Sequence, residues 1–162
     1  MASSWRNPTQ KLVVERLRTE GCEVYDFRAP DVQGGTEGGF HWSEIDADWK
    51  AWTPEHYREA LEHPLAVHGL GRDLAGMEWA DACVMVQPCG VSAAMELGYM
   101  LGRGKIGLVL LDGGDRFEPE LMFRLAHHLC LTLDEVVVKL SRGNQAHLAA
   151  DVLDHRAEEW RP

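Results

Sequence analysis

Residues 90–99, Gly-Val-Ser-Ala-Ala-Met-Glu-Leu-Gly-Tyr, directly follow an apolar stretch at residues 82–86 and decide how the chain folds. The apolar stretch is typical of a strand, and a glycine-containing turn and a helix follow it. A strand, a turn and a helix in this order place the start of the helix at the carboxyl edge of a parallel sheet, where open α/β folds bind ligands. Glu96 lies in the first turns of this helix. An ionised carboxylate held at such an edge is what attack on a sugar carbon requires.

Strand and helix patterns alternate along the rest of the chain. Strands are expected at residues 22–26, 82–87, 106–111 and 128–131, and a first strand at residues 1–4 is either very short or trimmed at its start. Helices are expected at residues 8–20, 53–62, 73–80, 92–103, 118–127, 132–141 and 144–160. This alternation predicts an α/β fold of three layers, in which helices cover both faces of a central parallel sheet of about five strands.

The whole chain, residues 1–162, is predicted to form one domain with a Trp-rich loop insertion at about residues 28–53. A loop of this length in a compact domain is usually either functional or mobile. Pro64 and the pair Gly69 and Gly71 are expected to interrupt the chain before the helix at residues 73–80.

Composition excludes several classes of partner. The formal net charge is −10, whereas binding to a nucleic-acid polymer needs a basic surface. No apolar run is long enough to span a membrane, and the first residues do not resemble a signal peptide, so a cytoplasmic protein is expected. The four cysteines and eight histidines show no metal-ligand spacing. Reduced thiols, no metal and no cofactor are therefore expected.

Several short motifs stand in a fixed order along the chain. They are residues 3–7, Asp73-Leu74, Ala80-Asp81, residues 90–99 and Gly104-Lys105. In this order they resemble the nucleoside 2-deoxyribosyltransferase superfamily, which includes the 2'-deoxynucleoside 5'-phosphate N-hydrolases. The resemblance implies a flavodoxin-like (Rossmann-like) fold, cleavage of the bond between a base and C1' of a deoxyribose, and Glu96 as the nucleophile. It also implies a homo-oligomer, a dimer or higher, in which a neighbour helps to close the site.

The chain departs from this family at two points. The first strand, which often carries an aromatic hydroxyl in the family, is largely missing. Transferases often carry an acidic residue six positions before the nucleophile, and Gly90 stands there in this chain. The choice between a transferase and a hydrolase therefore stays open.

Substrate-binding residues are predicted around Glu96. Gly90 lets the backbone approach a ligand closely, and Ser92 lies one helical turn before Glu96 on the same side. Ser4, Trp5 and Arg6 form the loop after the first strand. A solvated loop is the simpler interpretation, whereas the functional one is that Arg6 and Ser92 hold a 5'-phosphate.

Asp73 is the candidate second catalytic carboxyl, because a nucleobase leaves more easily when an acid assists it. The simpler interpretation is a helix cap. Rival acids are Glu44, Asp46 and Asp48. Trp42, with Phe40, Trp49 and Trp52, is predicted either to stack on a base or to form a small core under the loop. Cys89 is a further nucleophile candidate, although no base is evident beside it.

These residues are consistent with two functions, one of an enzyme and one of a binding module. The first is an enzyme, a nucleoside 2-deoxyribosyltransferase or a nucleotide N-glycosidase. It would cleave or exchange the N-glycosidic bond of a small-molecule nucleoside or nucleoside 5'-monophosphate through a covalent glycosyl-enzyme. The alternative is a module that binds a nucleotide or an ADP-ribose-like ligand without turnover, since one fold hosts many functions.

Overall fold

The computed structural model describes residues 1–29, 39–111 and 119–143. The helix expected at residues 144–160 and part of the Trp-rich stretch lie outside the described residues. The chain divides into two compact units. The sheet unit comprises Met1–Val24 and Asp81–Pro162, and the helical unit comprises Tyr25–Ala80.

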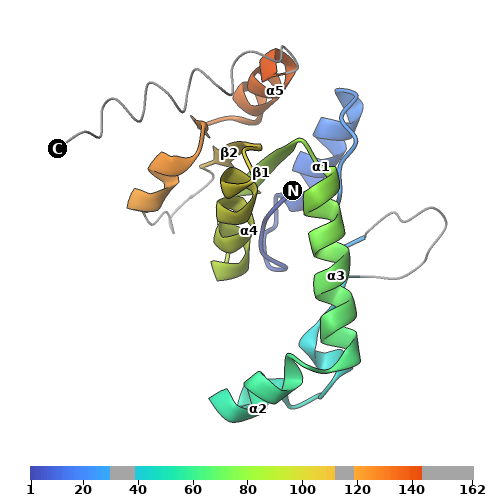
Figure 1. Ribbon diagram of the computed structural model, residues 1–162. Coiled ribbons are helices and arrows are strands. Elements are labelled where there is room, and N and C mark those ends of the chain that lie inside the picture. The colour runs from blue at the N-terminus through green and yellow to red at the C-terminus, as the bar shows by residue number, and fades with distance from the viewer. Residues whose placement is uncertain (30–38, 112–118, 144–162) are drawn as a thin grey trace. The chain divides into compact units, whose positions relative to one another are not determined.

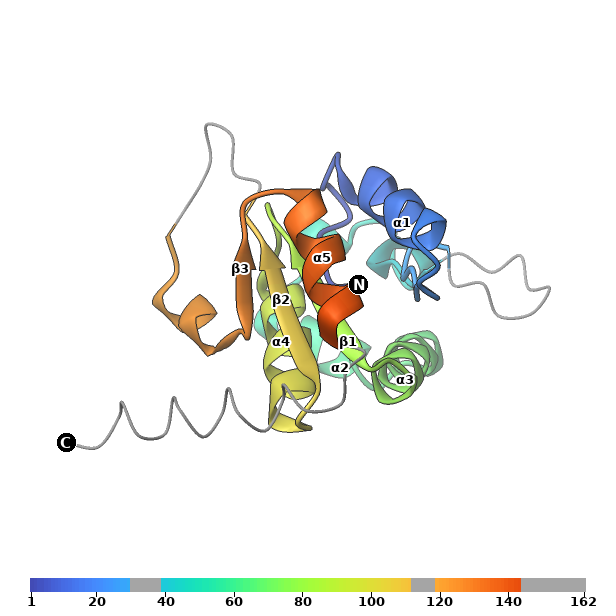
Figure 2. The same cartoon turned by 90° about the horizontal axis from the view of Figure 1, so that it is seen from above.

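The sheet unit is built on a small parallel sheet. Its strands are β1 (Ala82–Val86), β2 (Ile106–Leu110) and β3 (His128–Cys130), which neighbour one another in this order (Figure 2). Ala2 forms a single parallel bridge with Met85 on the other side of β1. A mixed α/β fold with an open parallel sheet is therefore confirmed. About five strands were expected, whereas the described residues hold three.

Residues 22–26 were predicted to form a strand, but this described segment forms none. The segment begins where Cys22 N donates to Leu17 O at 3.0 Å and closes the end of the preceding helix. On the side of β1 away from β2, Ala2 forms one bridge rather than a ladder. A single bridge presents no continuous row of N–H and C=O groups, so a further strand has no edge on which to form.

Different helices cover the two faces of the sheet, because successive side chains of a strand alternate between faces. On one face, α1 (Gln10–Thr19) and α5 (Leu133–Gly143) pack against the strands. The buried cluster there consists of Val13, Leu17, Val84, Val86, Leu108, Leu110, Cys130 and Val136. On the opposite face α4 (Val91–Gly102) approaches β2 so closely that a Cβ on Gly107 would stand 2.7 Å from Leu101.

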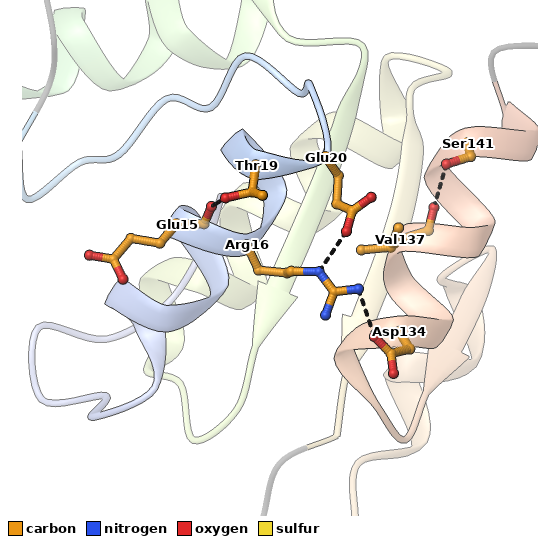
Figure 3. A network of polar contacts seen from close by, with 7 residues as sticks. All are labelled: Glu15, Arg16, Thr19, Glu20, Asp134, Val137 and Ser141. Carbon is orange, nitrogen blue, oxygen red and sulfur yellow. Dashed lines mark hydrogen bonds and ion pairs between the residues drawn. The ribbon is translucent and has the colours of Figure 1, made fainter.

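An ion-pair network joins the outer surfaces of α1 and α5 (Figure 3). Arg16 Nε donates to Glu20 Oε1 at 2.8 Å, and Arg16 Nη2 contacts Asp134 Oδ1 at 2.8 Å. These groups are solvent-exposed, so the network contributes little stability compared with the apolar cluster beneath it.

Asn7 fastens the first loop to the end of β1. Its Nδ2 donates to the carbonyl oxygens of Val86 at 3.2 Å and Pro88 at 3.1 Å. Its Oδ1 accepts from the backbone nitrogens of Thr9 at 2.8 Å and Gln10 at 3.1 Å. Because Asn7 is 2% exposed, these hydrogen bonds are shielded from water. One buried side chain therefore fixes both the start of α1 and the chain leaving β1.

The segment between β2 and β3 differs from expectation. A helix was predicted over residues 118–127, and the described part of it forms a 3-10 helix, η4 (Leu121–Leu125). Tight i to i+3 hydrogen bonds, such as Ala126 N to Phe123 O at 3.0 Å, let the short segment bury Phe123 directly before β3 begins.

The described residues of the helical unit form two α-helices and two short 3-10 helices. They are α2 (Pro54–Ala60), α3 (Pro64–Trp79), η1 (Trp42–Glu44) and η2 (Trp49–Ala51). Across the described ranges of the whole chain, no helix combines the length and the apolar character needed to cross a membrane.

The helix α3 is continuous (Figure 1), although Gly69 and Gly71 were expected to interrupt it. A Cβ on Gly69 would lie 2.7 Å from Cβ of Phe40, and a Cβ on Gly76 would lie 2.8 Å from the ring of Tyr25. Two of the glycines therefore let aromatic side chains rest against the helix backbone. This contact, rather than a break in the helix, explains why they are glycines.

Replacing Asn7 by alanine is expected to lower the free energy of unfolding by about 2–4 kcal/mol, because carbonyl and N–H groups at both loops lose a buried partner. Asn7→Asp keeps the acceptor for α1 but sets an oxygen against the carbonyls of Val86 and Pro88, so it should be at least as damaging. Urea denaturation measures both variants.

The matched control is Ser3→Ala, which removes one 3.3 Å hydrogen bond to Val86 O at the same strand end. It should cost about 1 kcal/mol or less. Equal losses for Asn7→Ala and Ser3→Ala would contradict the central role of Asn7.

Gly76→Ala is expected to destabilise the protein by about 1–3 kcal/mol, because the added methyl group meets the Tyr25 ring. Gly71→Ala in the same helix should instead stabilise it by up to about 1 kcal/mol, since alanine favours helix and no described heavy atom lies within 4 Å of its Cβ. Thermal and urea unfolding compare the two. Effects of the same sign at both positions would show that the contact with Tyr25 does not determine the choice of glycine.

Candidate functional site

The carboxyl edge of the sheet contains a topological switch point. The chain leaving Ala2 leads to α1 on one face of the sheet, and the chain leaving β1 leads to α4 on the opposite face. Loops that diverge in this way create the position at which open α/β sheets bind ligands. Both loops hold predicted site residues, which are Ser4, Trp5 and Arg6 after Ala2, and Gly90 and Ser92 after β1.

The start of α4 leaves room for a ligand. Gly90 is the N-cap residue, with φ −97° and ψ 179°, a conformation open to any residue. Gly90 is exposed, and within the described part of the chain no heavy atom lies within 4 Å of the position of a Cβ there. No described side chain caps the helix, so its first N–H groups face this space. The backbone conformation at Gly90 therefore does not require a glycine. Its lack of a side chain leaves space open at the end of the helix.

Glu96 lies in the second turn of α4 and is half-buried, whereas Ser92, four residues earlier, is exposed. The Glu96 carboxylate is close enough to the loop after β1 to act on the thiol of Cys89. The pKa of Cys89 is raised, first by burial and then by the negative charges of Glu120 and Glu96. This environment opposes a reactive thiolate at Cys89 and leaves Glu96 as the better candidate nucleophile on this loop and helix.

The first loop is folded on itself by Ser4. Its carbonyl oxygen accepts from Asn7 N at 2.9 Å and its Oγ accepts from Arg6 N at 3.2 Å. Trp5, 46% exposed, and Arg6 are turned toward solvent at the tip. Because Asn7 also bonds the end of β1, this loop and the start of α4 stand at one edge of the sheet.

Asp73 belongs to the helical unit, unlike Glu96. It lies inside α3 and not at its start, so the interpretation of Asp73 as a helix cap is wrong. Its Oδ1 accepts from the hydroxyl of Tyr25 at 2.9 Å. Burial raises the pKa of Asp73, and the Tyr25 hydrogen bond and the charge of Arg72 partly offset that effect. A raised pKa suits a proton donor, and its part in catalysis stays a prediction.

Trp42 stands at the centre of an aromatic cluster within the helical unit. Its ring lies edge-on to those of Phe40, Trp52 and Tyr57, with centroids 4.9, 5.6 and 5.5 Å away. Such packing matches the small core expected under the loop. Stacking of Trp42 on a base stays a prediction.

Two of the rival acids hold local structure. Asp46 accepts from the indole nitrogen of Trp52 at 2.6 Å, and this hydrogen bond is the main reason why its pKa is lowered. Glu44 accepts from His41 N at 2.6 Å and closes the start of η1. Asp46 also borders a hollow of about 480 Å³ within the helical unit, which Trp52 lines as well, whereas Glu96 and Asp73 do not.

Sequence reasoning missed Gln87, the residue that follows β1. Gln87 is 7% exposed, and its Oε1 has no hydrogen-bond partner among the described residues. A polar residue directly after an apolar strand was the signal available, but a glutamine there is usually solvated. No group of three or more His, Cys, Asp or Glu in the described ranges is arranged to hold a metal ion.

Comparison with known proteins identifies no relative of this chain. No protein-family model, no curated protein and no solved structure matches the chain.

Glu96→Gln is expected to speed alkylation of Cys89 at pH 8. Removing the negative charge lowers the pKa of the Cys89 thiol and so raises its thiolate fraction. Iodoacetamide labelling followed by peptide mass spectrometry separates Cys89 from Cys83, whose pKa burial raises to about 11. Glu15→Gln, on the exposed side of α1, should leave the rate unchanged. An unchanged Cys89 rate in Glu96→Gln would contradict the proximity of the two groups.

Proposed function

We propose that the protein cleaves the N-glycosidic bond of a deoxynucleoside or a deoxynucleoside 5'-monophosphate, with Glu96 as the nucleophile. The observation that supports this proposal is the half-buried Glu96 carboxylate in the second turn of a helix whose N-terminal end is clear, at the switch point of a parallel sheet. The sugar would lie across the start of α4, where backbone N–H groups meet its oxygens.

The reaction has two steps. Glu96 attacks C1', the bond from C1' to the base nitrogen breaks with its electron pair going to the base, and the base takes up a proton. The glycosyl ester on Glu96 is then attacked at C1' by water, which loses a proton while the carboxylate is released. A hydrolase uses water in this second step, whereas a transferase uses the nitrogen of a second base. The sequence offers Asp73, which belongs to the helical unit, as the candidate for the acid that supplies this proton.

Glu96→Gln is expected to reduce base release by about a thousandfold or more, because an amide cannot form the glycosyl ester. A panel of deoxynucleosides and their monophosphates is incubated with the protein, with and without an acceptor base, and products are separated by chromatography. Acid-quenched wild type should carry a glycosyl adduct on the Glu96 peptide. The control Glu15→Gln changes an exposed carboxylate on α1 and should keep full activity.

Each outcome of this experiment identifies a different function. Exchange into the acceptor base identifies a transferase, and release of free base alone identifies a hydrolase. Asp73→Asn should slow base release while ligand binding persists. Equal base release by wild type and Glu96→Gln would overturn the role of Glu96, and tight binding without product would favour a binding module.

A further inference from the structure

Gln87 continues the β1 ladder by one residue. Its backbone nitrogen donates to Leu110 O at 3.1 Å, so the alternation of side chains extends to this position. Gln87 therefore shares a face with Met85, whereas Val86 belongs to the cluster that packs against α1 and α5. The side chain of Gln87 accordingly lies on the face that α4 covers.

The direction of α4 brings its first turn over Gln87. Leu97 and Leu101, from the middle and end of α4, pack against Gly107 near the amino end of β2. The helix thus runs antiparallel to the strands, and its start at Val91 lies at their carboxyl end. Gln87 is at that same end and on the face that α4 covers, which is where the uncapped first turn of the helix lies.

The backbone around Gln87 is fixed, whereas the oxygen of its carboxamide has no hydrogen-bond partner among the described residues. The carbonyl oxygens on both sides of Gln87, those of Val86 and Pro88, are bound by Asn7. Its own Oε1 is shielded from water and has no hydrogen-bond partner among the described side chains and backbone. A buried acceptor left unpaired is costly, and such groups are rare in folded proteins unless they serve a ligand or hold a water molecule.

We infer that Gln87 is a specificity-determining residue whose carboxamide oxygen accepts a hydrogen bond from a hydroxyl group of the sugar. This inference rests on the proposed nucleoside-binding function. A hydroxyl suits the position because it donates to Gln87 while accepting from the N–H groups of α4. A fully ionised phosphate has acceptors only, so it cannot donate to Gln87 Oε1 and leaves this oxygen unpaired.

The test is a double-mutant cycle. The protein loses the carboxamide of Gln87, and the ligand loses one hydroxyl group. Wild type and Gln87→Met are compared in binding a 2'-deoxynucleoside, its 5'-deoxy analogue and its 3'-deoxy analogue, by calorimetry. Wild type should lose about tenfold in affinity for the analogue that lacks the recognised hydroxyl. Gln87→Met should bind the parent nucleoside about tenfold more weakly and no longer discriminate. The two analogues distinguish the 5'-hydroxyl from the 3'-hydroxyl.

A second measurement needs no ligand. Methionine removes the unpaired acceptor at similar volume, so Gln87→Met should raise the melting temperature by a few degrees. A lower or unchanged melting temperature would show that Oε1 is already paired, for instance by a trapped water, and would overturn the inference. Equal discrimination of the analogues by wild type and Gln87→Met would overturn it as well, while leaving the proposed function intact. Failure of wild type to bind any nucleoside would overturn both.

Discussion

The chain segments that follow Ala2 and β1 lead to opposite faces of the sheet, and one buried asparagine, Asn7, holds them together. The divergence of these segments creates the space at the sheet edge, but it also separates the carbonyl groups of Val86 and Pro88 from the β ladder. Asn7 supplies donors to both of these groups and an acceptor to the start of α1. The position of the first loop, the direction of α1 and the chain before α4 therefore depend on the same side chain.

Local patterns predicted those elements whose partners follow them closely along the chain, as β2 follows β1. The apolar runs of β1 and β2 and the helix α4, expected at residues 92–103 and found at Val91–Gly102, are of this kind. The segment at residues 22–26 has a comparable pattern, yet a strand there depends on a neighbouring edge that a single bridge at Ala2 does not provide. The glycines of α3 were misjudged for a related reason. Glycine is needed there because the side chains of Phe40 and Tyr25, which are distant in sequence, lie against the helix backbone.

The same distinction applies to the candidate site. The sequence predicted that Glu96, Ser92 and Gly90 share one loop and helix, because their spacing is local. It did not predict that Asp73 lies inside α3, where Tyr25 donates a hydrogen bond to it and burial raises its pKa. Nor did it single out Gln87, because burial of that residue results from α4 packing above it and from Asn7 fixing the backbone around it.

Electrostatics bears on the kind of ligand that the sheet edge accepts. The chain carries a net charge of −10, and the charges of Glu120 and Glu96 both act on Cys89, which stands between Gln87 and the start of α4. A phosphate dianion at this position would gain hydrogen bonds from the helix but would meet two carboxylates and an oxygen acceptor. A neutral hydroxyl gains the same N–H donors, pairs with the Gln87 oxygen and carries no charge for the carboxylates to repel. The acidic surroundings and the unpaired oxygen of Gln87 thus both favour an uncharged hydroxyl over a phosphate at this edge of the sheet.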